Sequence, residues 1–187
     1  MDRKIALLRR RSRTTMKPVL PDVLRPGLAV VFCGTAAGTL SAQRGAYYAH
    51  PQNKFWRTLH GIGLTPRLFA PAEFPLLPQY GIGLTDIAKH TFGMDSQLTP
   101  GSLGRDAVAD LRARILRAAP RLLAFTSLAG GRRVLGSKVT FGAQTQTIGA
   151  TRLWVLPSPS PAAQWNWDES VWRALASEVA AMRDAAS

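Results

Sequence analysis

A continuous run of apolar residues, LAVVFC from Leu28 to Cys33, constrains the fold more than any other stretch of the sequence. Pro26-Gly27 precedes it and Gly34 follows it, so the run is bounded by residues that favour turns. A strand that is apolar at every position buries both of its faces, which is typical of a parallel sheet covered by helices. The run therefore predicts a buried strand in an α/β protein.

Strand and helix patterns alternate along the rest of the chain. Phe55, Trp56, Leu59 and Ile62 recur at helical spacing, and proline suits a first helical position, so we expect a helix to begin at Pro51. Further strands are expected over 80–87 and 121–127, a hairpin over 145–157, and helices over 103–119, 129–135 and 171–182. This alternation predicts one α/β domain with three layers, α/β/α, and a mainly parallel central sheet.

The charge of the chain indicates a polyanionic partner. Its 187 residues carry 24 Lys and Arg against 11 Asp and Glu, a formal charge of +13. Such an excess favours nucleic acid first and an anionic membrane surface second. Seven basic residues lie among the first 17, so we expect residues 1–20 to form a basic, flexible arm and residues 21–187 to form the domain.

The sequence offers little that would bind a metal or a cofactor. Cys33 is the single cysteine and is expected to be a buried structural thiol. His50, His60 and His90 share no metal-ligand spacing, so we predict neither a metal nor a cofactor. No apolar stretch is long enough to cross a bilayer, and no secretory segment is recognised. We expect a cytoplasmic monomer that associates with the bacterial nucleoid through DNA.

Three segments follow predicted strands and are expected to share one edge of the sheet. These are GTAAG after the first strand, Asp86 at the end of the second and PSPSP after the last. Ligands of open α/β sheets bind beyond the carboxyl ends of the strands. GTAAG, taken as a turn between strand and helix, would bring backbone N–H groups close to an anion or a carbonyl oxygen.

The sequence around these segments resembles the uracil-DNA glycosylase superfamily. The matching text is LRPGLAVVFCGTAAGTLSAQRGAYYAHPQNKFW, then GIGLTDI, then TIGATRLWVLPSPSPA, in the order and spacing of the family. The nearest branches are the mismatch-specific uracil/thymine and the hypoxanthine-DNA glycosylases. The resemblance implies the fold of that superfamily, a partner in uracil-containing DNA, and a flipped base whose bond to deoxyribose is cleaved.

The resemblance also implies roles for individual residues in binding the base. Tyr48 stands where the family has an aromatic that stacks on the base. Backbone donors of Gly34, Thr35 and Ala36 would face the carbonyl oxygen on which negative charge grows as the base departs. Asp86 would accept a hydrogen bond from N3–H of uracil or N1–H of hypoxanthine, and would disfavour cytosine, whose N3 is itself an acceptor.

Two departures from the family bear on catalysis. Ala36 occupies the position where other branches hold an Asn, Asp or Glu that positions water, and a methyl group cannot do so. The hypoxanthine branch instead uses the Asn of YYAHPxNxFW, which makes Asn53 the catalytic candidate. The second motif, LPSPSPAA, has Ser where some relatives carry an electrophilic His.

The second motif is expected to contact DNA. Ser158 and Ser160 would bind phosphates beside the lesion, and Pro161, Ala162 and Ala163 would form a wedge in the groove. The tryptophans of the following segment, Gln164 to Trp167, would either extend the wedge or pack against the last helix.

The function expected from the resemblance is a monofunctional glycosylase that hydrolyses the N-glycosidic bond of uracil. Hypoxanthine excision and binding of uracil-DNA without turnover stay open, and a phosphate-cradling mononucleotide enzyme lacks a P-loop lysine. From the residues alone, each site also has a structural alternative. The glycines would serve strand geometry only, Tyr47 or Tyr48 would be a core aromatic, Asn53 would bond at a helix end, and Asp86 would cap a helix.

Overall fold

The apolar run of the sequence forms the middle of a five-stranded sheet. The computed structural model describes residues 17–94, 97–99 and 101–184. The strands are β1 (Val30–Ala37), β2 (Ile82–Phe92), β3 (Leu122–Phe125), β4 (Gly142–Ile148) and β5 (Thr151–Val155). They lie in the order β2-β1-β3-β5-β4, parallel except for the edge strand β4, which pairs antiparallel with β5. The predicted α/β class and mainly parallel sheet are confirmed.

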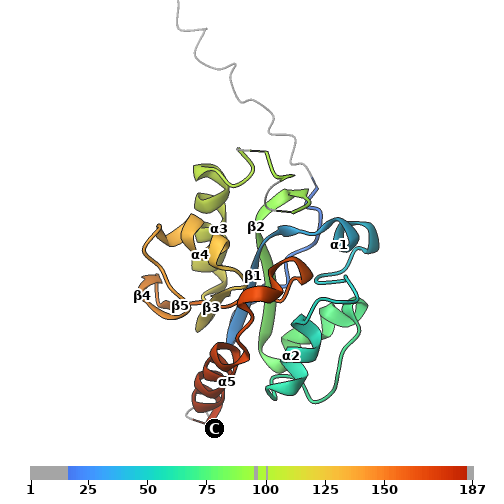
Figure 1. The fold of residues 1–187 in the computed structure, drawn as a ribbon. Helices are drawn as coiled ribbons and strands as arrows, with labels where there is room; N and C mark the ends of the chain where they lie inside the picture. The colour runs from blue at the N-terminus through green and yellow to red at the C-terminus, as the bar shows by residue number, and fades with distance from the viewer. Residues whose placement is uncertain (1–16, 95–96, 100, 185–187) are drawn as a thin grey trace, which may run out of the picture.

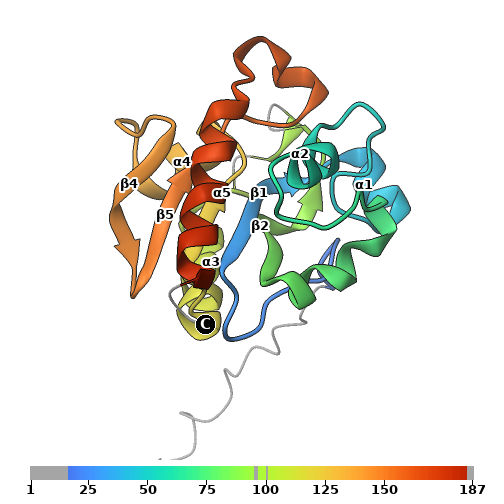
Figure 2. The same ribbon diagram turned by 90° about the horizontal axis from the view of Figure 1, so that it is seen from below.

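Helices cover both faces of the sheet (Figures 1 and 2). They are α1 (Thr39–Arg44), α2 (Phe55–Gly61), η1 (Pro71–Tyr80), α3 (Arg105–Ala118), α4 (Leu128–Leu135), η3 (Pro161–Asn166) and α5 (Glu169–Asp184). One core packs α2, η1 and α5 on the sheet, and within it Phe32 lies 5.4 Å from Phe55 and 5.6 Å from Trp172, between ring centroids. The other core packs α3 and α4, through residues such as Leu111 and Val134.

The structure corrects the sequence prediction at the first motif. β1 continues to Ala37, so Gly34, Thr35 and Ala36 lie in the strand and not in a turn. The extension occurs because β2 is long enough to pair with it, Gly34 opposite Asp86 and Ala36 opposite Ala88. The short helix α1, which begins after Gly38, was not predicted.

The second helix also begins later than predicted, at Phe55 and not at Pro51. The His50 carbonyl accepts a hydrogen bond from the Asn53 backbone N–H at 2.8 Å, which closes a turn over Pro51. The Asn53 side chain then accepts from the Phe55 N–H at 2.9 Å. These two bonds satisfy the backbone before the helix starts, as capping groups do.

Part of the predicted basic arm lies against β2. Residues 1–16 fall outside the described residues, but residues 17–20 are described. The Val19 N–H donates to the Lys89 carbonyl at 2.7 Å, Leu20 is buried, and Val23 forms an antiparallel bridge with Leu84. This segment brings Asp22 beneath the carboxyl edge of the sheet.

Candidate active site

The carboxyl ends of the parallel strands meet where Gly34 of β1 faces Asp86 of β2. Gly34 pairs with Asp86, and Thr126, directly after β3, donates its backbone N–H to the Cys33 carbonyl at 2.9 Å. A Cβ atom built on Gly34 would overlap Oδ1 of Asp86 and would lie 3.6 Å from the Tyr48 hydroxyl. Glycine is required here because the carboxylate and the hydroxyl fill the space that a side chain would take.

The Asp86 carboxylate is buried and accepts no hydrogen bond from the described residues. The residue is 4% exposed, and no group in the described part of the chain donates to its carboxylate oxygens. Burial raises the pKa of the Asp86 carboxyl from 3.8 to about 6, against the lowering effect of Lys89. Asp22 raises this pKa further and Arg114 lowers it. A buried carboxylate with free acceptor sites is suited to bind a donor that comes from a ligand.

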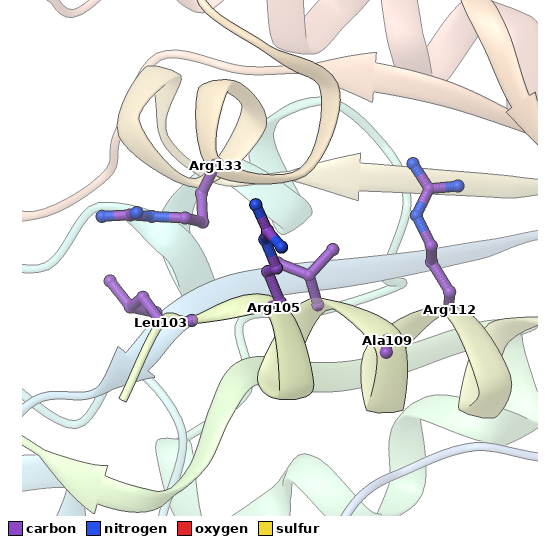
Figure 3. A pocket seen from close by; sticks show the side chains of 7 residues that line it. Leu103, Arg105, Ala109, Arg112 and Arg133 are labelled. Carbon is purple, nitrogen blue, oxygen red and sulfur yellow. The ribbon is translucent and has the colours of Figure 1, made fainter. Parts of the chain in front are cut away.

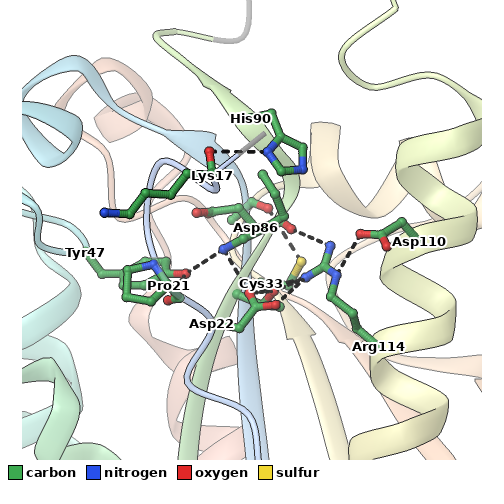
Figure 4. Close-up of polar contacts among 12 residues, drawn as sticks. Lys17, Pro21, Asp22, Cys33, Tyr47, Asp86, His90, Asp110 and Arg114 are labelled. Carbon is green, nitrogen blue, oxygen red and sulfur yellow. Dashed lines mark hydrogen bonds and ion pairs between the residues drawn. The ribbon is translucent and has the colours of Figure 1, made fainter. Parts of the chain in front are cut away.

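A polar network lies beneath this carboxylate (Figure 4). Lys89, which is 7% exposed, places its Nζ 2.8 Å from Oδ1 of Asp22 and 3.1 Å from the Tyr47 hydroxyl. Arg114 of α3 donates to the Asp86 backbone carbonyl at 3.0 Å, pairs with Asp22 at 3.3 Å and contacts the Thr85 hydroxyl. The network ties α3 and the N-terminal segment to β2 and puts two cations behind Asp86.

Sequence reasoning missed Asp22, Lys89 and Arg114. One signal was present, because Lys89 stands next to the apolar strand GIGLTDIA and a lysine at a buried position needs a partner. The identity of that partner was not readable, since Asp22 lies far away in the sequence.

The two adjacent tyrosines have different surroundings. Tyr47 is a core residue whose hydroxyl donates to the Pro21 carbonyl at 3.1 Å. Tyr48 is half-buried, with a left-handed φ of 53°, and its ring stacks on Phe55 with 3.9 Å between centroids. Its hydroxyl is 3.2 Å from the Thr126 hydroxyl, and burial raises the pKa of its phenol well above the ordinary value. Tyr48 is therefore the tyrosine that lies beside Gly34 and Asp86.

Asn53 uses its side-chain oxygen within the backbone of its own segment. As described above, Oδ1 accepts from the Phe55 N–H, which leaves the two Nδ2 hydrogens as the donors that a ligand would meet. The next residue, Lys54, donates its backbone N–H to the Pro159 carbonyl at 2.9 Å. This hydrogen bond joins the first motif to the second.

The second motif forms a loop that is braced by its own serines. Ser158 Oγ accepts from the Ser160 N–H, and Ser160 Oγ accepts from the Ala162 N–H, both at 3.3 Å. Pro161 begins the short helix η3, in which Ala162 is exposed and Ala163 half-buried. The serine oxygens therefore shape the loop, and their hydroxyl hydrogens remain for an acceptor.

The structure separates the two tryptophans that follow. Trp167 packs with its ring 4.7 Å from Lys54 Nζ and 5.8 Å from the Trp172 ring, both measured to centroids. Trp165 is 86% exposed, which is unusual for so large an apolar side chain. Of the two sequence alternatives, packing describes Trp167, whereas Trp165 projects into solvent beside the loop.

Two open clefts lie on the surface of the described part of the chain. One, of about 290 Å³, is lined by Lys54, Arg57, Thr58, Trp167 and Glu169. The other, of about 420 Å³, lies between α3 and α4 (Figure 3). Neither is lined by Gly34, Tyr48 or Asp86, so both clefts are distinct from the predicted base site.

Within the described ranges, no group of three or more His, Cys, Asp or Glu side chains is arranged to hold a metal ion. None of the helices found there has the length and apolar character required to span a membrane.

Comparison with known proteins gives two findings. The family model of the uracil DNA glycosylase superfamily matches residues 21–177. The fold is similar to the solution NMR structure of a proposed uracil DNA glycosylase from Methanosarcina acetivorans, with a TM-score of 0.59 and 23% sequence identity. The match covers 88% of this chain and 98% of that one, and at this identity it concerns the fold alone.

Proposed function

Because the chain belongs to the uracil DNA glycosylase superfamily, a group of DNA glycosylases, we propose that it removes uracil from DNA and leaves an abasic site. The proposed enzyme is monofunctional and acts as a monomer on uracil-containing DNA in the cytoplasm. In the reaction the bond between C1′ of deoxyribose and N1 of uracil breaks, and its electron pair leaves with the base. The oxygen of a water molecule bonds to C1′ and releases one proton, and the uracil anion takes up a proton.

The observation that carries the proposal is the buried Asp86 carboxylate, which has no hydrogen bond within the described residues. Above its pKa of about 6 it is an acceptor only, so it fits the N3–H donor of uracil and repels N3 of cytosine. Lys89 and Arg114 behind it offset part of the repulsion between this carboxylate and the departing uracil anion.

The remaining residues take the following roles in the proposal. Tyr48 stacks on the base, and the backbone of Gly34, Thr35 and Ala36 stabilises the charge that develops on the pyrimidine oxygen. Asn53 holds the water through its Nδ2 donors, since Oδ1 is bonded to the Phe55 N–H. An oxocarbenium-like sugar needs an oriented water more than a strong base, which is why an amide suffices.

In the proposal, the second motif contacts the DNA backbone and groove. The hydroxyl hydrogens of Ser158 and Ser160 bond to backbone phosphates, while Pro161, Ala162 and Ala163 enter the groove. The exposed indole of Trp165 extends this wedge and stacks on a neighbouring base.

A second candidate function is the binding of uracil-DNA without turnover. Two observations favour it: Ala36 offers no group for water, and the Asn53 oxygen is occupied by the Phe55 N–H. Hypoxanthine is an alternative substrate for the enzyme, because its N1–H presents the same donor to Asp86.

The test is a cleavage assay on matched oligonucleotides that contain U·G, U·A, T·G or hypoxanthine·T, together with single-stranded uracil. The wild type, Asn53→Ala and the control Gln52→Ala, whose side chain is the exposed neighbour, are compared after hot-alkali treatment. We expect uracil release by the wild type and the control, and a fall of about a hundredfold or more in Asn53→Ala.

Other outcomes decide between the alternatives. If Asn53→Ala still releases uracil, the proposed glycosylase activity stands and Asn53 is rejected as its catalytic residue. If the protein cleaves the hypoxanthine duplex in preference, hypoxanthine is its substrate in place of uracil. Absence of release from every substrate, with DNA binding retained, selects the binding function.

A further inference from the structure

Three arginines line the cleft between α3 and α4, and none of them has an acidic partner among the described residues (Figure 3). Arg105 and Arg112 come from α3 and Arg133 from α4. None of the three forms an ion pair with another described residue, and the only hydrogen bond among them runs from Arg112 to the Val134 carbonyl at 3.2 Å. Figure 3 shows Arg105 rising from α3 toward α4, where Arg133 extends.

The chemistry of the cleft fits a phosphate group. Its remaining lining is apolar or small: Leu103, Gly104, Val108 and Ala109. No carboxylate is among the lining residues, so the three positive charges of the cleft are not compensated by its own lining. An anion in the cleft would compensate these charges, and the planar donors of arginine match phosphate oxygens in pairs.

The cleft lies on the side of the molecule to which the candidate active site opens. Arg114 of α3 reaches the Asp86 backbone carbonyl with its guanidinium group. Arg105 precedes it by nine residues, so it stands about 13 Å further along the helix, toward the carboxyl edge of the sheet. On the other wall, Ser127 caps α4 through the Gly130 N–H at 2.9 Å and lies 3.3 Å from the Thr35 hydroxyl. The α4 wall of the cleft therefore begins beside Thr35, and Arg105 of the α3 wall lies toward the same edge of the sheet.

We propose that this cleft binds a backbone phosphate of the DNA, outside the nucleotide whose base is held over Gly34. The inference rests on the proposed function, since it names a second contact with the same substrate. A phosphate contact fixes the position of the duplex and adds affinity without reading the base. The cleft is therefore a positioning site, and it adds to the contacts of the second motif.

The test compares two double variants that lose the same charge. Arg105→Gln with Arg133→Gln empties the cleft of two guanidinium groups. The control, Arg117→Gln with Arg132→Gln, changes exposed arginines of the same two helices that do not line it. Arg112 is left intact because it bonds to α4. Binding of a 20-base-pair duplex, with and without uracil, is measured between 50 and 200 mM salt, and thermal unfolding checks that each variant is folded.

We expect the cleft variant to bind both duplexes about tenfold more weakly, and the slope of log K against log salt to fall by about 1 in magnitude. Excision at saturating DNA should be unchanged. Equal weakening in the control pair would mean that overall charge attracts the DNA, and would overturn the proposal. Unchanged binding in the cleft pair would also overturn it and would point to an acidic protein segment as the occupant. The binding measurement needs no excision, so it can fail or succeed independently of the proposed function.

Discussion

Replacing Asp86 with Asn removes a buried charge that lowers the free energy of unfolding. The two side chains have the same size, so the change leaves the space over Gly34 filled while abolishing ionisation. Burial raises the pKa of Asp86 from 3.8 to about 6, a shift of roughly two units. At 1.36 kcal/mol per unit, the ionised carboxylate lowers the free energy of unfolding by about 3 kcal/mol.

The sign follows from proton linkage. Between pH 3.8 and 6 the folded protein binds this proton more tightly than the unfolded chain, so stability falls as the pH rises through that window. Above pH 6 the loss is complete. We therefore expect Asp86→Asn to exceed the wild type in free energy of unfolding by about 3 kcal/mol at pH 8, and by only about 1 kcal/mol at pH 4.5.

Urea unfolding of both proteins at the two pH values measures this difference, in which the titration of other groups common to both proteins largely cancels. A gain that is the same at pH 4.5 and pH 8 would refute the buried ionised carboxylate. The excision assay adds a second readout. The wild-type rate should fall as the pH drops below about 6, because the protonated acid presents an O–H donor and no negative charge, and Asp86→Asn should lack this limb.

Three further substitutions test the surroundings of this carboxylate. Gly34→Ala should destabilise the protein by about 1–3 kcal/mol, as urea unfolding would report, because the new methyl overlaps Asp86 Oδ1; unchanged stability would contradict the close approach. Tyr48→Phe should cost about 1 kcal/mol in the same experiment by removing the bond to Thr126, and should leave base stacking intact, whereas loss of uracil binding would assign a role to the hydroxyl. Trp165→Ala should weaken DNA binding by about 1–3 kcal/mol in a fluorescence titration with no loss of stability, and unaltered affinity would remove Trp165 from the wedge.

The sheet and most helices follow from local sequence patterns. The strand LAVVFC is apolar at each position because both of its faces are covered, and Gly149-Ala150 joins β4 to β5 in the predicted hairpin. Boundaries were harder to predict because they depend on partners elsewhere. β1 extends to Ala37 only because β2 continues beside it. The glycines of GTAAG instead predicted a turn at this point.

The candidate site was predictable in its members but not in its electrostatics. Gly34, Tyr48 and Asp86 could be chosen from motifs, and the structure brings them together. The network of Asp22 and Arg114 joins residues that are 92 positions apart, and nothing local in either segment indicates the other. Trp165 and Trp167 have near-identical sequence surroundings, so only the packing against Trp172 distinguishes them.

The close approach of Asp86 to Gly34 also has an evolutionary consequence. One carboxylate oxygen of Asp86 occupies the place that a β-carbon of residue 34 would take, so a substitution at position 34 requires a change at position 86. A protein of this family that carries a side chain at position 34 needs a shorter or differently oriented residue at position 86. It would then lack the carboxylate acceptor that is proposed to bind the base. Substitutions at the two positions should therefore occur in pairs among the members of the superfamily.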